Sequence, residues 1–301
     1  MRNLFFLLPL MIFSCSQNSE RTAIKTVAFA IDTVMVDPGE DFIYMQDGAS
    51  TISPDGAFFY HFSNHNHALE KIDLEKLRVV DKQPFEKEGP NGTGDMVYSI
   101  HMLDENRIYI NAHQSSGIFR LDGTRTEHFN LDYDFEGDLI TAYEGVDYHI
   151  MVPDQPGVVF ALVFNSEDNT INLRKMDFKE KRITKYDIDP EGKIPRYSFT
   201  VPSIGKNPIG NPGVYLSVEG GNLLVTTNLS DEIARYDPVG DSLVFKRNHH
   251  QLVANEKVGK YSIEYASIRD LMVTYQKLGK KSIFCRLYGM RRMNGITALP
   301  T

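Results

Sequence analysis

A strand–turn–strand unit recurs four times along the middle of this sequence. Each unit begins with a run of apolar and aromatic residues that is bounded by Gly, Asp, Asn or Pro, as β-strands are. The four runs are residues 58–62, 107–111, 158–164 and 222–227. Between residues 20 and 260, no segment keeps apolar residues at helical spacing for three turns. The sequence therefore predicts an all-β fold.

A second strand in every unit ends close to an aspartate, and a third strand follows it. These marker aspartates, which stand 49, 55 and 60 residues apart, are Asp73, Asp122, Asp177 and Asp237. The third strands are expected at residues 78–80, 126–129, 182–186 and 242–245. We place each aspartate in the turn between the third and fourth strands of a blade, where its carboxylate can accept backbone N–H groups. A strand unit of this period is typical of β-propellers. A β-sandwich with coincidental spacing is the weaker alternative, because all four units keep the same order.

The N-terminus has the pattern of an export signal. Arg2 precedes the apolar run 4–13, which is shorter than the roughly 20 residues that span a bilayer. The segment 12–15 (Ile-Phe-Ser-Cys) resembles a bacterial lipobox, which implies that Cys15 becomes the first mature residue and carries the lipid. We expect a signal peptide at 1–14 and a polar tether at 15–21, so that lipid on Cys15 anchors the chain to a membrane. An ordinary signal peptide with a chance cysteine is the alternative.

Two loop motifs add a family resemblance. Residues 53–56 (Ser-Pro-Asp-Gly), with the strand end at 72–74, resemble the blade motif of TolB-like propellers. Residues 88–94 resemble the inter-blade loop of six-bladed, NHL-like propellers. With the lipobox, residues 1–270 are similar to an uncharacterised family of Bacteroidetes lipoproteins with a six-bladed propeller. The resemblance implies a fold and a place in the cell envelope, but no reaction and no cofactor.

The C-terminal thirty residues differ from the rest. Residues 271–301 have a formal charge of +6, which leaves −14 for residues 1–270 of the net −8. Four blades and a partial fifth near residues 261–275 are recognisable, whereas six blades need roughly 300 residues beyond the signal. We therefore expect a propeller domain at 22–270 that is truncated or frameshifted at its C-terminus. The alternative is a basic tail that touches anionic lipid or a partner. The alternating residues 22–36 are candidates for the strand that closes the ring.

Few residues suggest chemistry. His61, His65 and His67 have a spacing that suits zinc or copper on a strand, but a solvated polar turn is the better interpretation. The pair His249–His250 is interpreted in the same way. The acidic segment 132–138 lacks EF-hand spacing, so we expect an inter-blade loop, with calcium binding as the lesser alternative. No hydrolase, nucleotide-binding or zinc-protease motif is present, and we assign no catalytic, cofactor or metal residue.

Charge and cysteine content narrow the function further. The net charge of −8 argues against nucleic-acid binding. Two cysteines form at most one bridge, and an acylated Cys15 would leave Cys285 as the only thiol. We expect a lipoprotein on the periplasmic face of the outer membrane, because no dense acidic tag follows Cys15. Its propeller loops would bind a protein, a small molecule or a glycan.

Two other functions stay open at this point. One is a hydrolase or lyase centred on the channel of the propeller, and the other is a truncated, non-functional remnant. Three or more His, Asp or Glu side chains that converge on the channel mouth would favour the enzyme.

Overall fold

A computed structural model of the chain describes residues 33–39, 42–45, 48–112, 115–129, 135–205, 208, 212–249, 254–257, 259 and 261–279. The chain divides into two compact units, residues 1–35 and 36–301. Only residues 33–35 of the first unit are described, and the account below concerns the second. The expected signal peptide, Cys15, the tether, most of the expected closing strand 22–36, and residues 280–301 with Cys285 lie outside the described residues.

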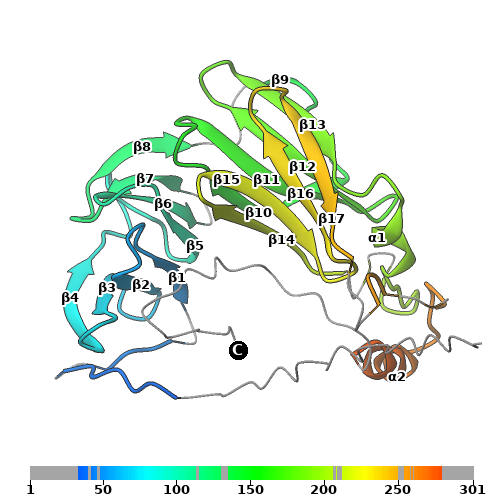
Figure 1. Cartoon of the computed structure of the whole chain (residues 1–301), viewed down its shortest axis with the longest axis horizontal. Coiled ribbons are helices and arrows are strands. Elements are labelled where there is room, and N and C mark those ends of the chain that lie inside the picture. Colours follow the sequence, from blue (N-terminus) through cyan, green and yellow to red (C-terminus); the bar gives the residue numbers. More distant parts are fainter. Residues whose placement is uncertain are drawn as a thin grey trace, which may run out of the picture. The chain divides into compact units, whose positions relative to one another are not determined.

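Within its described residues, the second unit contains four sheets, each built on four consecutive antiparallel strands, which we call blades 1 to 4 in chain order (Figure 1). Blade 1 has β1 (Gly48–Ile52), β2 (Phe58–Ser63), β3 (Ala68–Asp73) and β4 (Arg78–Pro84). Blade 2 has β5 (Val97–Met102), β6 (Arg107–Ala112), β7 (Ser116–Arg120) and β8 (Arg125–Phe129). Blade 3 has β10 (Glu144–Met151), β11 (Val158–Asn165), β12 (Thr170–Asp177) and β13 (Arg182–Asp187), with the short β9 (Glu136–Gly137) at its edge. Blade 4 has β14 (Val214–Glu219), β15 (Asn222–Thr227), β16 (Glu232–Asp237) and β17 (Ser242–Arg247).

The last three strands of every blade lie where the sequence predicts them. The first strands, β1, β5, β10 and β14, were not located in advance. They mix small, polar and apolar residues, as in the sequence Val-Tyr-Ser-Ile-His-Met of β5. Each pairs with the second strand of its own blade and has no strand of that blade on its other side. The position of each first strand is therefore set by its pairing with the second strand more than by its amino-acid composition.

Consecutive blades bury their faces against each other. On β6, Ile108 and Ile110 belong to the hydrophobic core shared with blade 1, whereas Tyr109 belongs to the core shared with blade 3. On β11, Val159 packs towards blade 2, and Phe160 packs towards blade 4. Because side chains alternate across a strand, burial of both faces produces continuous apolar runs. The fold is all-β with a propeller arrangement of blades, as predicted; the expected number of six blades stays a prediction.

The marker aspartates close the turns between third and fourth strands, as predicted. Asp177 Oδ1 accepts the backbone N–H groups of Lys179 at 3.0 Å and Glu180 at 2.9 Å. In the other blades, Asp73 accepts the N–H groups of Glu75 and Lys76, Asp122 accepts that of Thr124, and Asp237 accepts that of Val239. We call this end of the blades the turn end. The opposite end, where each first strand begins, is the entry end.

Two helices accompany the blades in the described residues. The short α1 (Lys193–Arg196) lies in the connection from β13 to β14, and α2 (Ile268–Gly279) follows blade 4. The prediction of a partial fifth blade near residues 261–275 is therefore wrong from residue 268 onwards, where the chain is helical. Leu271 and Leu278 of α2 join the core between blades 3 and 4. The expected start of the basic tail at residue 271 falls inside this helix. In the described part of the chain, neither helix has the length and apolar character to cross a bilayer.

Candidate functional site

The three clustered histidines, His61, His65 and His67, have different environments in the structure. His61 lies on β2, where its buried Nδ1 is 3.0 Å from the Glu70 carboxylate. The Nε2 atom of His67 is 2.8 Å from the Thr93 hydroxyl, and both groups are buried. His65 alone is exposed at the turn. The expectation of a solvated polar turn is therefore wrong for His61 and His67. Among the described residues, no group of three or more His, Cys, Asp or Glu could hold a metal ion.

The partner of His61 was missed because it is nine residues away in sequence. The antiparallel register of β2 and β3 places His61 directly opposite Glu70. Cross-strand neighbours of this kind lie about 5 Å apart at Cβ, so the contact between the two side chains follows from the register. Pairing the residues of β2 and β3 one by one outwards from the hairpin turn would have identified Glu70 as the partner of His61.

The acidic segment is an inter-blade connection, as predicted, and residues 132–134 of it lie outside the described residues. Its remaining residues include β9, which pairs in parallel with β13. The Asp138 carboxylate accepts the backbone N–H of Lys185 at 2.8 Å. Of the second histidine pair, His249 is exposed and His250 is not described.

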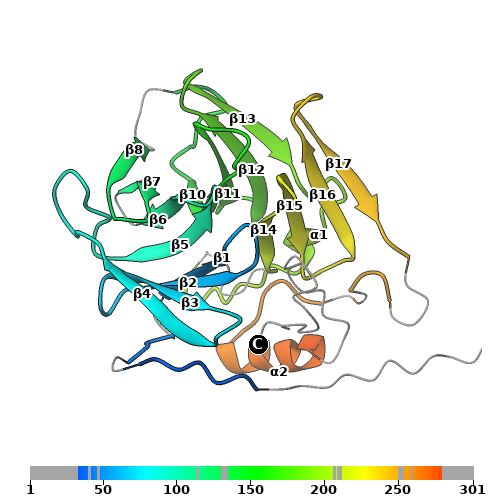
Figure 2. The same cartoon turned by 60° about the vertical axis from the view of Figure 1, so that its left-hand side comes forward.

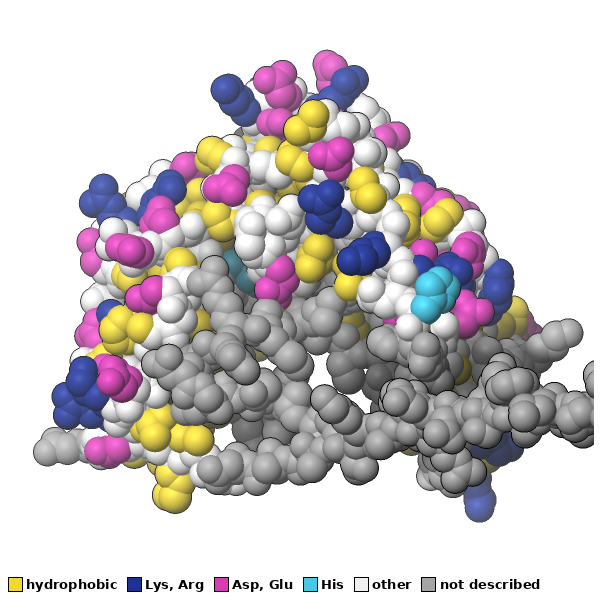
Figure 3. Space-filling model, viewed as in Figure 1, with side chains coloured by type: hydrophobic (Ala, Val, Ile, Leu, Met, Phe, Trp, Pro, Cys, Tyr) yellow, Lys and Arg dark blue, Asp and Glu magenta, His cyan; other side chains and the backbone are white. Residues whose placement is uncertain are grey.

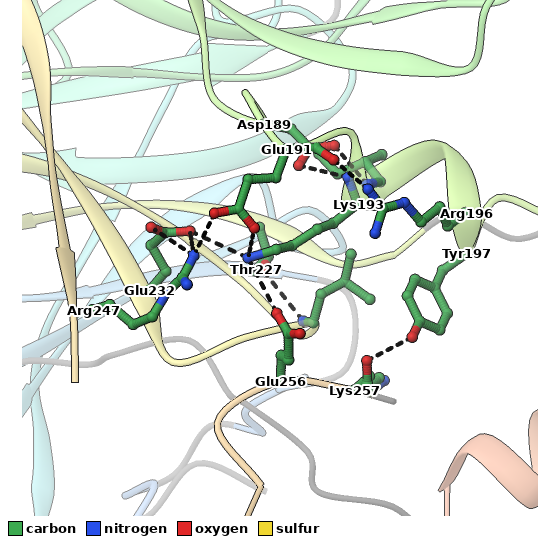
Figure 4. Close-up of polar contacts among 12 residues, drawn as sticks. Asp189, Glu191, Lys193, Arg196, Tyr197, Thr227, Glu232, Arg247, Glu256 and Lys257 are labelled. Atoms are coloured by element: carbon green, nitrogen blue, oxygen red, sulfur yellow. Dashed lines mark hydrogen bonds and ion pairs between the residues drawn. The ribbon is translucent and has the colours of Figure 1, made fainter. Parts of the chain in front are cut away.

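A cluster of charged side chains surrounds Lys193 at the entry end of blade 4 (Figure 4). The Lys193 ammonium lies 3.0 Å from a carboxylate oxygen of Glu191, 3.4 Å from one of Glu256 and 3.5 Å from one of Glu232. Burial alone would lower the pKa of Lys193, but the hydrogen bond with Glu191 and the charge of Glu232 outweigh it, and the pKa is raised. Lys193 is therefore a charged group fully matched by carboxylates.

Arg247, at the end of β17, adds a second cation to this cluster. It lies 2.8 Å from Glu191 and 3.4 Å from Glu232. Hydrogen bonds from Arg247 and then Lys193 lower the pKa of Glu191. The carboxylates of Glu191 and Glu256 are about half exposed, so the cluster presents negative groups to solvent.

Backbone contacts hold the three segments that form this cluster. Asp189 accepts the N–H groups of Lys193 at 2.8 Å and Ile194 at 2.6 Å, which fixes the start of α1. The segment 254–257 is tied to the connection between β15 and β16, because the N–H of Lys257 donates to Leu229 at 2.7 Å. The hydroxyl of Tyr197 donates to the carbonyl of Lys257 at 2.6 Å. The charged groups therefore lie on loops that are held in place by hydrogen bonds to the blades and to one another.

Sequence reasoning did not find this cluster. Its charged residues come from separate segments of the chain: Glu191 and Lys193, Glu232, Arg247, and Glu256. The register of β16 and β17 pairs Glu232 with Arg247. No spacing relates this pair to the other three residues, which join it only when blade 3 stacks on blade 4. Figure 3 shows acidic and basic side chains interspersed over the face it displays, without a concentrated basic patch.

A buried histidine joins blades 2 and 3. The Tyr109 hydroxyl lies 2.6 Å from His149 Nδ1, and both side chains are buried. Burial lowers the pKa of His149 to about 4. The imidazole is therefore neutral in the folded protein at neutral pH and shares a hydrogen bond with the Tyr109 hydroxyl.

We expect acid to destabilise the protein through His149. An imidazole in the unfolded chain binds a proton below about pH 6.5, whereas the folded protein resists protonation of His149 until about pH 4. This contribution to stability is complete above pH 6.5 and is lost as the pH falls towards 4. It amounts to about 2 kcal/mol between pH 7 and pH 5, measurable by urea unfolding.

The variant His149→Gln should flatten this pH dependence, because the amide group can still hydrogen-bond with Tyr109 but does not titrate. The exposed His65→Gln is the matched control and should keep the slope of the unmodified protein. An unchanged slope in His149→Gln would show that other groups cause the acid effect.

Stacked four-stranded blades with ordered polar loops define this chain as a protein of the β-propeller class. Residues 25–288 match the family described as domain of unknown function DUF4221, and the chain belongs to this family. Among curated proteins, no sequence matches it.

Many solved structures resemble the chain, among them the following three. A DUF4221 member from Bacteroides vulgatus is 13% identical over 74% of this chain and 63% of its own, with a TM-score of 0.49. Hydrazine synthase of Kuenenia stuttgartiensis is 13% identical over 63% and 64% of the two chains (TM-score 0.37). The extracellular domain of a putative one component system from B. thetaiotaomicron is 12% identical over 76% and 26% (TM-score 0.37). The present chain thus spans less than two thirds of the length of each.

Proposed function

We propose that this chain is an exported lipoprotein, anchored to the outer membrane through Cys15, whose propeller binds a ligand or a partner protein. The Lys193 cluster is the observation that carries the binding function. There, loops at the entry end are held by backbone hydrogen bonds and ion pairs while Glu191 and Glu256 reach solvent. Loops positioned by a rigid scaffold are where proteins place recognition residues.

The electrostatics of the cluster support recognition over catalysis. A lysine that acts as nucleophile or base needs a lowered pKa. Three carboxylates surround Lys193, and its pKa is raised instead. The side chains left at the surface are the carboxylates of Glu191 and Glu256 beside the partly exposed guanidinium of Arg247, a chemistry that suits a partner with cationic or hydrogen-bond-donating groups.

The experiment follows the full chain in its native cell. With labelled palmitate we expect acylation of the unmodified protein and of Cys285→Ala, but not of Cys15→Ala, which should leave the membrane fraction. A photo-crosslinking phenylalanine derivative in place of the exposed Tyr143, at the entry end of blade 3, should yield a discrete adduct.

The same derivative in place of Ile52, an exposed residue at the end of β1 and so at the turn end of blade 1, is the control for the crosslink. Label that persists in Cys15→Ala would refute the anchor. Equal adducts from both positions, or adducts from neither, would refute binding at the entry end.

A further inference from the structure

Two blades carry an additional segment that pairs in parallel with their outermost strand, the short strand β9 in blade 3 and a single bridge at Asp37 in blade 1. In blade 3, the N–H of Glu136 donates to Lys181 at 2.9 Å, and that of Asp138 donates to Ile183 at 2.9 Å. In blade 1, the N–H of Asp37 donates to Leu77 at 2.7 Å. Both added segments precede their own blade in sequence and pair at its turn end.

The local geometry of the two edges is the same. Leu77 and Lys181 are the last residues of turns that begin after Asp73 and Asp177, and their φ angles are 53° and 51°. The carbonyls of these two residues accept the first hydrogen bond of the added segment. The left-handed residue before the outer strand is thus the common acceptor.

Blade 4 repeats this geometry at β17. Asp241 is the last residue of a turn of the same length, with φ 45°. The pair Tyr236 and Leu243 has the register that Met176 and Ile183 have in blade 3. By this equivalence, the Asp241 carbonyl and the N–H groups of Leu243 and Phe245 face away from β16. Within the described residues, β17 is the outermost strand of its sheet (Figure 2).

We propose that the outer edge of β17, residues 241–245, binds an extended segment of a partner protein as a parallel fifth strand. Addition of a strand to an exposed edge is an established mode of peptide recognition. The inference rests on the proposed binding function and assigns it a second surface, at the turn end of blade 4.

The two segments already seated on such edges indicate the chemistry of the partner. Both have an apolar residue, then an acidic residue at the paired position, then Pro or Gly, namely Val-Asp-Pro at 36–38 and Phe-Glu-Gly at 135–137. Phe135 packs on Phe178, the first residue of the turn, with ring centroids 5.2 Å apart. In blade 4 that turn offers Pro238 and the almost fully exposed Val239. The basic Lys246, exposed on β17, complements an acidic segment.

A second copy of this chain fits the edge less well. A two-fold axis would pair two β17 strands antiparallel, because symmetry-related edges of one strand run in opposite directions. Both seated segments run parallel to the outer strand. A heterologous segment is therefore the occupant that the geometry favours.

The test uses a fluorescent peptide of residues 133–140, Tyr-Asp-Phe-Glu-Gly-Asp-Leu-Ile, titrated with the full chain and followed by anisotropy. We expect saturable binding that Phe245→Pro weakens at least tenfold. Proline removes the N–H equivalent to that of Lys185, which donates to Asp138 in blade 3. A proline is tolerated on an edge strand where its missing N–H faces solvent. The matched variant Phe245→Leu keeps this N–H and should bind within about twofold.

A peptide N-methylated at the residue equivalent to Asp138 supplies a test that does not alter the protein, and it should bind at least tenfold more weakly. Binding that neither change weakens would place the peptide elsewhere and overturn the edge, while binding by this protein would stand. Absence of saturable binding would also overturn the proposed binding site at β17. That result would leave the predictions on acylation and on crosslinking at the entry end unaffected. A dimer that Phe245→Pro dissociates would assign the edge to a second copy instead.

Discussion

Replacement of Arg174 by methionine should lower the free energy of unfolding by about 3–5 kcal/mol. Arg174 on β12 lies 2.8 Å from the Glu144 carboxylate, and both side chains are only 3% exposed. Arg174 also donates to the side-chain oxygen of Asn172. Methionine fills a similar volume but leaves the Glu144 carboxylate in the interior without its cation. The cost arises from that unpaired buried charge more than from lost packing.

Urea unfolding of Arg174→Met beside Arg107→Met measures this effect. Arg107 makes a comparable contact with Asp104, at 2.6 Å, but these side chains are 44% and 42% exposed. Solvent screens the exposed pair, so its loss should cost no more than about 1 kcal/mol. The double variant Arg174→Met with Glu144→Leu should recover much of the stability, because both buried charges are removed. Equal losses from the two arginine variants would contradict the burial argument.

The second large effect is expected from Phe160→Ala, which should destabilise the protein by about 3–5 kcal/mol. Phe160 on β11 is fully buried between blades 3 and 4, and its ring centroid lies 4.8 Å from that of Tyr236 on β16. Alanine removes this contact and leaves a cavity between two sheets. Neighbouring strands cannot collapse into it without breaking their own ladders, so relaxation recovers little.

Urea unfolding also measures the loss in Phe160→Ala. Val239→Ala, a truncation at an almost fully exposed position, is the control and should change stability by no more than about 0.5 kcal/mol. Phe160→Leu should fall between the two, since it keeps much of the buried volume. If Phe160→Ala unfolds at the same urea concentration as the control, the core between blades 3 and 4 does not contribute as the structure indicates.

Local patterns predicted the turns of the blades correctly. The marker aspartates could be placed in the turns between third and fourth strands because their function needs only the next two or three backbone N–H groups. The prediction of a solvated polar turn at His61 and His67 was wrong because the partners of these side chains are distant in sequence. Their partners, Glu70 and Thr93, are reached across a hairpin and across an inter-blade loop. A helix at 268–279 was also missed, since its apolar positions have a partner only after blades 3 and 4 have packed.

By itself, the sequence determined the all-β class, the order of the last three strands of each repeat and the turns that join them. These features depend on a side-chain period of two and on turn residues, which act over fewer than ten positions. Only the tertiary structure decided which charges meet. Glu191, Lys193, Glu232, Arg247 and Glu256 form one cluster, and β17 shares the edge geometry of β4 and β13. Both results depend on strand register and on the stacking of one blade against the next, because contacts between sheets join residues whose separation in sequence carries no period.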